Sequence, residues 1–310
     1  MFLRRIIKSD HNTLLGILAI LFWGSTVAFS RSLTEQLGTI TAGGLVFMLS
    51  ALFAWVYLLF TSPGKFKKMI YLSPFYLWGC GALFVIYMAT LYLAIGLSTN
   101  RQQVIEVSII NYLWPGLTLL FSVTILQKRA RLSIIPGIFL GFVGVYIAMN
   151  PYHHFSFSPF LQNIQNNSLP YIFAFIAAIS WALYSTLARK WAGKDEEGAV
   201  PIFLSLTGLL LLVLGLFFQE ESVWSFKVGL ELLYMAIFPT FLAYFFWDRA
   251  MRRGNIVLVA TLSYFTPLLS VFISSVYLQI LVDMRLWVAS ILVVTGAIVS
   301  KLSISETKDF

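Results

Sequence analysis

The residues best suited to chemistry lie in the stretch 103–121, QVIEVSIINYLWPGLTLLF, an apolar segment that carries the carboxylate of Glu106 and the carboxamide of Asn111. An α-helix turns about 100° per residue, so Glu106, Asn111 and Trp114 share one face. An ionised carboxylate at bilayer depth is costly, and such groups usually face a water-filled cavity on a substrate or proton route. We predict that Glu106 binds substrate or carries protons. In the alternative interpretation, Glu106 lies near a helix end, where it reaches water or caps a neighbouring helix.

The composition predicts that this face belongs to a polytopic membrane protein. Hydrophobic residues make up 59% of the chain, charged residues only 11%, and the mean hydropathy is +0.85. Soluble domains have about a quarter of charged residues. Ten apolar runs are each long enough to cross a hydrocarbon core of about 30 Å. They lie near 13–33, 41–61, 71–95, 103–125, 132–150, 169–189, 199–218, 228–247, 255–279 and 286–303.

The basic residues are distributed unevenly between the connecting segments. With the N-terminus placed in the cytoplasm, 17 of the 21 lysines and arginines fall on the cytoplasmic side. The four on the other side are Arg31, Arg101, Lys227 and Arg285. Cytoplasmic loops of membrane proteins carry such an excess. The net charge of +8 therefore indicates membrane topology, with both termini cytoplasmic, and no nucleic-acid partner is expected.

The two halves of the chain share a pattern at a fixed offset. Tyr112 and Pro115 align with Tyr264 and Pro267, in both cases 152 residues apart. Five helices per half is an odd number, so the second half must be inserted in the opposite orientation. Inverted repeats are typical of secondary transporters, whose substrate site lies between the halves. We predict an all-α fold with a 5+5 inverted repeat: a first repeat at 1–150, an extracytoplasmic linker at 151–168 and a second repeat at 169–310. Helix kinks are expected at both prolines.

Other motifs are interpreted as structural. The aromatic residues Tyr71, Tyr76 and Trp247 lie near the ends of predicted helices, which is typical of interfacial belts. Cys80 is alone, so no disulfide or metal pair is expected. The adjacent His153 and His154 lack carboxylate or cysteine company, and we predict no metal site.

The motifs IEV-x3-NYLWP, SWALYS, AYFFWDRAMRRGN and SYFTPLLS resemble those of bacterial aromatic amino acid exporters of the drug/metabolite transporter superfamily, the EamA type. The resemblance covers nearly the whole chain. It implies a multi-pass protein of the bacterial inner membrane with a central cavity lined mainly by helices 1, 3, 4, 6, 8 and 9. The substrate-binding residues that it implies are Trp23, Tyr87, Glu106, Asn111, Trp114, Trp181, Tyr184, Tyr244 and Tyr264. The sequence departs from the family pattern at Asp248, Arg249, Arg252 and Arg253, which we interpret as loop variation.

The expected function is export of aromatic and other neutral amino acids by alternating access. Aromatic walls can stack on a large side chain and hold an ammonium group. Glu106 would pair with the α-ammonium, and Asn111 would donate to the carboxylate. The alternative is a carrier of hydrophobic cations such as methyl viologen. The chain has no nucleotide-binding loop and no HExxH or Gly-x-Ser-x-Gly motif, so neither a nucleotide-driven pump nor an enzyme is expected. We expect a monomer without cofactors, in contact with amino acid and lipid.

Overall fold

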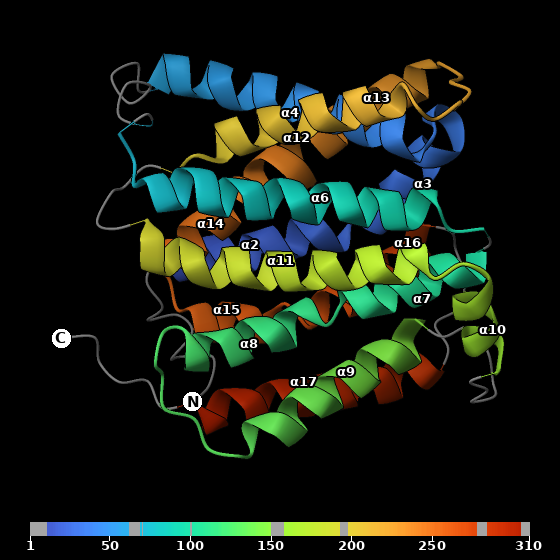
Figure 1. Cartoon of the computed structure of the whole chain (residues 1–310). Helices are drawn as coiled ribbons and strands as arrows, with labels where there is room; N and C mark the ends of the chain where they lie inside the picture. The colour runs from blue at the N-terminus through green and yellow to red at the C-terminus, as the bar shows by residue number, and fades with distance from the viewer. Residues whose placement is uncertain are drawn as a thin grey trace.

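The computed structural model describes residues 11–61, 69, 71–99, 101–149, 158–192, 198–277 and 284–304. The described residues are predominantly helical, apart from turns and an isolated bridge between Ala130 and Ile304. The helices stack as roughly parallel rods, with α6 and α11 crossing the middle of the view in Figure 1 and α9 and α17 together at its lower edge. His153 and His154 lie outside the described residues.

The helices of the first half form five rods. These are α2 (His11–Gly24) with α3 (Thr26–Leu37); α4 (Thr39–Thr61); η1 (Phe75–Cys80) with α6 (Gly81–Gly96); α7 (Arg101–Asn111) with α8 (Trp114–Thr124); and α9 (Ile134–Met149). η1 is a π-helical segment continuous with α6. The short helix α10 (Ser158–Asn166) lies between the halves.

The second half repeats this series over its described residues. Its rods are α11 (Leu169–Trp191); α12 (Val200–Gly215); α13 (Phe226–Met235), η2 (Ala236–Leu242) and α14 (Ala243–Arg253); α15 (Ile256–Leu262) with α16 (Phe265–Tyr277); and α17 (Met284–Ser303). Five helical segments among the described residues are long and apolar enough to span a bilayer, and five shorter apolar helices fill the other predicted positions. The prediction of an all-α polytopic membrane protein is confirmed.

The packing of the rods follows the expected pseudo-symmetry. α14 of the eighth rod packs on α2 of the first, and α11 of the sixth packs on α6 of the third, which is the same pairing with the halves exchanged. α4 packs on α12, and α9 on α17, as equivalent rods should. The fourth rod is interrupted at Tyr112–Leu113 and the ninth at Ser263–Tyr264, just before Pro115 and Pro267. The first rod is also interrupted, at Ser25, whereas the corresponding α11 is continuous.

Glycines allow α9 and α17 to approach each other closely. A Cβ built on Gly296 of α17 would lie 2.5 Å from the backbone nitrogen of Gly141 and 2.6 Å from the backbone oxygen of Gly137. Small residues permit this kind of contact between membrane helices. Because backbone atoms form the contact, no side chain can rotate to make room for a larger residue.

We therefore expect Gly296→Ala to lower the free energy of unfolding by about 1–3 kcal/mol, as overpacking does. Gly229→Ala is the matched control, because a Cβ at Gly229 of α13 meets nothing within 4 Å. Thermal unfolding of the purified variants in detergent measures the difference. Equal melting temperatures for both variants would contradict the close contact.

Candidate functional site

Aromatic side chains from both halves meet around Trp181 of α11. The Trp181 ring lies 4.6 Å from that of Tyr87, 5.0 Å from that of Tyr184 and 5.8 Å from that of Trp23, between centroids. We call this group the aromatic cluster: Trp23, Phe84, Tyr87, Trp114, Trp181, Tyr184, Tyr244 and Trp247. Edge-on and tilted contacts dominate, and such pairs contribute about 0.5–1.5 kcal/mol each beyond burial. The rings fill the interface between the two repeats.

Helix interruptions position two of these tryptophans. Trp23 lies at the end of α2, just before the interruption at Ser25, and Trp114 begins α8, directly after the interruption at Tyr112–Leu113. The Trp23 indole donates a hydrogen bond of 3.0 Å to the backbone oxygen of Pro239, inside the π-helical segment η2. A wide helical turn at a proline leaves carbonyl groups open to such partners. This hydrogen bond links Trp23 to the eighth rod.

Asn111, near the aromatic cluster in the chain, has an unsatisfied oxygen. The residue is 7% exposed and lies three residues before Trp114 in the chain. Its Oδ1 is buried without a hydrogen-bond partner. An unpaired buried acceptor costs about 1–3 kcal/mol. A ligand that donates a hydrogen bond at this point would remove that cost.

Glu106 lies in α7, before the interruption at Tyr112–Leu113, and has different neighbours from Trp114. Its carboxylate accepts a short hydrogen bond from the Tyr171 hydroxyl and one of 3.2 Å from the Asn163 amide of α10. The surrounding apolar group is a separate core that includes Ala94, Val107 and Ala174. The structure therefore places Glu106 beside the linker helix, whereas Asn111 lies closer to Trp114 along the chain.

Tyr264 also has a local packing role. It lies in the turn between α15 and α16, and it is 1% exposed. A Cβ on Gly116 would lie 2.7 Å from the Tyr264 hydroxyl oxygen, and one on Gly141 would lie 3.1 Å from the ring. The tyrosine thus packs against glycines of the fourth and fifth rods.

A buried ion pair adjoins the aromatic cluster. Asp248 Oδ2 accepts a hydrogen bond of 2.7 Å from Arg252 Nε, and both side chains are at least 96% buried. Asp248 Oδ1 accepts from the hydroxyls of Tyr76, at 2.7 Å, and Tyr184, at 2.9 Å. The Arg252 guanidinium also lies over the Tyr76 ring, 5.6 Å from its centroid. We call these four residues the polar cluster.

The two clusters are directly joined. Trp247 precedes Asp248 in the chain, and its ring lies 5.0 Å from that of Trp23. Tyr184 contributes its ring to the aromatic cluster and its hydroxyl to Asp248. Charged groups of the polar cluster therefore lie at the edge of an aromatic core.

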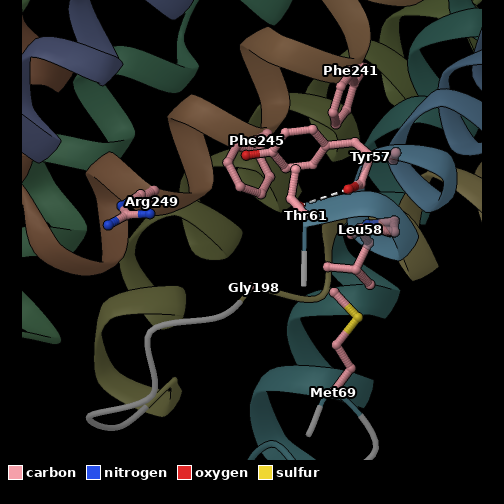
Figure 2. A pocket seen from close by; sticks show the side chains of 10 residues that line it. Tyr57, Leu58, Thr61, Met69, Gly198, Phe241, Phe245 and Arg249 are labelled. Atoms are coloured by element: carbon pink, nitrogen blue, oxygen red, sulfur yellow. Dashed lines mark hydrogen bonds between the residues drawn. The ribbon is translucent and has the colours of Figure 1, made fainter. Parts of the chain in front are cut away.

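A small cavity lies near the polar cluster, on the side of α4. Its volume is about 110 Å³, and its lining includes Tyr57, Phe241, Phe245 and Gly198. Figure 2 shows the three rings gathered together, with Gly198 on the segment beyond them. Gly198 lies against the ion pair, because a Cβ there would overlap Asp248 Oδ2 and would lie 2.9 Å from Arg252 Nη2. Gly198 thus lines this cavity and also lies against the two charges.

Hydrogen bonds from Arg189 and Arg249 join neighbouring rods near the end of α14. Arg189 of α11 donates to the backbone oxygens of Met251, at 3.1 Å, and Gly254. Arg249 Nε donates to Asn12 Oδ1 at 3.0 Å, which ties α14 to the start of α2. The third, sixth and eighth rods therefore contribute the residues of the polar cluster. The Arg249–Asn12 hydrogen bond joins the first rod to the eighth nearby.

These contacts correct three interpretations from the sequence. Trp247 and Tyr76 are fully buried, so neither belongs to an interfacial belt, while Tyr71 is 85% exposed. Asp248, Arg249, Arg252 and Arg253 all belong to helix α14 and do not represent loop variation. The predicted eighth helix ended at residue 247, which placed Asp248 and Arg252 outside the membrane. Their i, i+4 spacing was the available signal, since such residues share one helix face.

Comparisons with known proteins agree with this architecture. The chain is 32% identical to the "Aromatic amino acid exporter YddG" of Escherichia coli (strain K12), over 94% of this chain and 97% of the relative. It is 31% identical to the protein of the same name from Ancylobacter novellus, over 94% and 96%. A solved structure described as "Crystal structure of protein" superposes with a TM-score of 0.79 at 26% identity, covering 95% of this chain and 98% of the other.

The family model named "EamA-like transporter family" matches twice, at residues 12–150 and 168–302. The two matches fall on the two sets of rods described above. The resemblance identified from the sequence motifs is therefore confirmed. This multi-pass membrane protein belongs to the EamA-like transporter family.

Proposed function

We propose that this protein exports aromatic and other neutral amino acids from the cytoplasm. The observation that carries the proposal is the aromatic cluster, which is buried between the repeats and contains rings from the first, third, fourth, sixth and eighth rods. The relatives named as aromatic amino acid exporters support it. A substrate ring would replace ring contacts that the cluster makes with itself, so little aromatic stacking is lost on binding.

Transport would proceed by alternating access between the two repeats. The rings now contact one another, so the cluster must separate to admit a substrate. The matched interruptions in the fourth and ninth rods offer places where the helices can bend. We also propose the domain boundaries expected from the sequence, with repeats at 1–150 and 169–310 and a linker at 151–168. We further propose a monomer in the bacterial inner membrane, with both termini cytoplasmic.

Counterflow in proteoliposomes tests this function. Vesicles are loaded with unlabelled phenylalanine or threonine, and uptake of the labelled amino acid is compared with that of empty vesicles. Methyl viologen is included as a competitor. Amino acid exchange above the control supports the proposal. Absence of exchange, together with loss of methyl viologen from loaded vesicles, would favour the hydrophobic-cation carrier instead.

Glu106 is the proposed site of proton coupling. Its side chain is 7% exposed, and neutral donors on Tyr171 and Asn163 contact its carboxylate. We expect Glu106→Gln to retain counterflow, which needs no net proton movement, and to lose the pH dependence of net export. Tyr171→Phe is the companion variant, since it removes only the hydroxyl. Net export by Glu106→Gln with an unchanged pH profile would exclude this role.

A further inference from the structure

The polar cluster has the chemistry of a site for an α-amino acid headgroup. Asp248 and Arg252 present one negative and one positive charge whose hydrogen-bonding atoms are 2.7 Å apart. An amino acid carries an ammonium and a carboxylate on the same carbon. Aligned head to tail with the ion pair, each charge of the substrate meets its opposite. The complex then holds four buried charges, two from the protein and two from the substrate. Each of them lies beside an opposite charge.

We propose that Asp248 binds the α-ammonium and Arg252 the α-carboxylate of the substrate, while the substrate side chain enters the aromatic cluster. This proposal rests on the proposed function and refines it, because Glu106 and Asn111 would no longer be the main contacts of the headgroup. The guanidinium plane suits a carboxylate, to which it can donate two parallel hydrogen bonds. The carboxylate of Asp248 suits an ammonium group, which has three donors.

The position of the pair supports this assignment. Tyr184 links Asp248 to the ring of Trp181, so a headgroup at Asp248 has its side chain directed toward the aromatic core. Tyr76 holds Asp248 from the third rod, at 2.7 Å. A second pair on the same rod, Lys227 and Glu231, has the same i, i+4 spacing, but its lysine is 64% exposed and its atoms are 3.6 Å apart. Only the first of these two pairs adjoins aromatic rings of both repeats.

The buried ion pair lies next to a residue that lines a cavity. That residue is Gly198, and Tyr57, Phe241 and Phe245 line the same cavity (Figure 2). An amino acid displacing the Asp248–Arg252 contact would therefore have both an approach on one side and an aromatic site on the other. A substrate ammonium at Asp248 would also compete with the hydroxyls of Tyr76 and Tyr184, which join the third and sixth rods to the eighth.

Three probe molecules distinguish recognition of the ammonium group from recognition of the carboxylate. Phenylalanine carries both groups, phenethylamine carries the ammonium alone, and 3-phenylpropionate carries the carboxylate alone. Binding to purified protein in detergent is followed by tryptophan fluorescence, and each probe is also tested as an inhibitor of phenylalanine counterflow. Wild-type protein should prefer phenylalanine.

Two variants should shift the relative affinity for phenethylamine and 3-phenylpropionate in opposite directions. Asp248→Asn should favour 3-phenylpropionate over phenethylamine, and Arg252→Gln should favour phenethylamine, each by about tenfold relative to wild type, as expected for a charged hydrogen bond. Glu231→Gln is the matched control and should keep the wild-type order. A general loss of affinity would reduce binding of all three probes equally.

Tyr184→Phe decides the question if the charge variants do not fold, because it keeps the ring and removes one hydrogen bond to Asp248. It should alter the affinity for phenethylamine and leave that for 3-phenylpropionate nearly unchanged. Opposite shifts in the charge variants, or the selective shift in Tyr184→Phe, support the proposal. Equal losses for all probes, or an unchanged order, overturn it. Failure of wild-type protein to bind or exchange phenylalanine would instead reject the proposed function itself.

Discussion

Replacement of Trp181 by alanine is expected to abolish counterflow of phenylalanine and to weaken that of threonine much less. The Trp181 side chain is 1% exposed, and its ring contacts rings from the first, third, fourth and eighth rods. Truncation removes the centre of the aromatic cluster, and a buried Trp→Ala change typically costs about 3–5 kcal/mol of stability. A small substrate depends less on those ring contacts than an aromatic one does.

Trp181→Phe and Trp224→Ala separate the loss of binding from structural damage. Trp181→Phe keeps an aromatic ring and should recover part of the phenylalanine exchange. Trp224 is 60% exposed, so its replacement should leave exchange and melting temperature near the wild-type values. Counterflow of both amino acids and thermal unfolding are measured on the same preparations. Equal loss of phenylalanine and threonine exchange in Trp181→Ala would show that the tryptophan acts through folding alone.

The fold could be predicted because two features of the sequence strongly constrain it. Runs of apolar residues must match the bilayer thickness, and basic residues select one side of it. Trp23, Trp114 and Trp181 were identified through the family resemblance of the motifs that contain them. The structure places these three in mutual ring contact.

The polar cluster was not predicted because the i, i+4 spacing of its charges was overlooked and its tyrosines come from distant parts of the chain. A hydropathy profile counts Asp248 and Arg252 as two penalties and ends the helix before them. In the structure, α14 continues to Arg253, and the pair is buried by Tyr76 and Tyr184 from other rods. Those tyrosines are 172 and 64 residues from Asp248 along the chain, so no local pattern connects them.

Asp248→Ala is expected to destabilise the protein by about 3–5 kcal/mol, the usual effect of removing one member of a buried ion pair. The Asp248 side chain is 1% exposed and that of Arg252 is 4% exposed, so the guanidinium would lose the Asp248 carboxylate in a place that water hardly reaches. The hydroxyls of Tyr76 and Tyr184 would lose the same acceptor. Thermal unfolding in detergent, compared with wild type, measures the loss.

The double variant Asp248→Leu with Arg252→Met provides the control, because replacing both charges by apolar residues of similar volume leaves no unpaired ion. It should be more stable than Asp248→Ala. It should remain below wild type, since the two tyrosine hydroxyls still lack their acceptor, at about 1–3 kcal/mol each. A double variant as unstable as the single one would show that packing, and not charge, decides the stability of this region.

The same double variant separates folding from transport. If Asp248 serves only to join the third, sixth and eighth rods through Tyr76 and Tyr184, a variant with apolar contacts in its place should exchange phenylalanine normally. If Asp248 and Arg252 bind the headgroup, the folded double variant should lose phenylalanine exchange despite its recovered stability. We expect the second result, because a substrate with two charges cannot enter a buried site that offers neither counter-charge without losing hydration that nothing replaces.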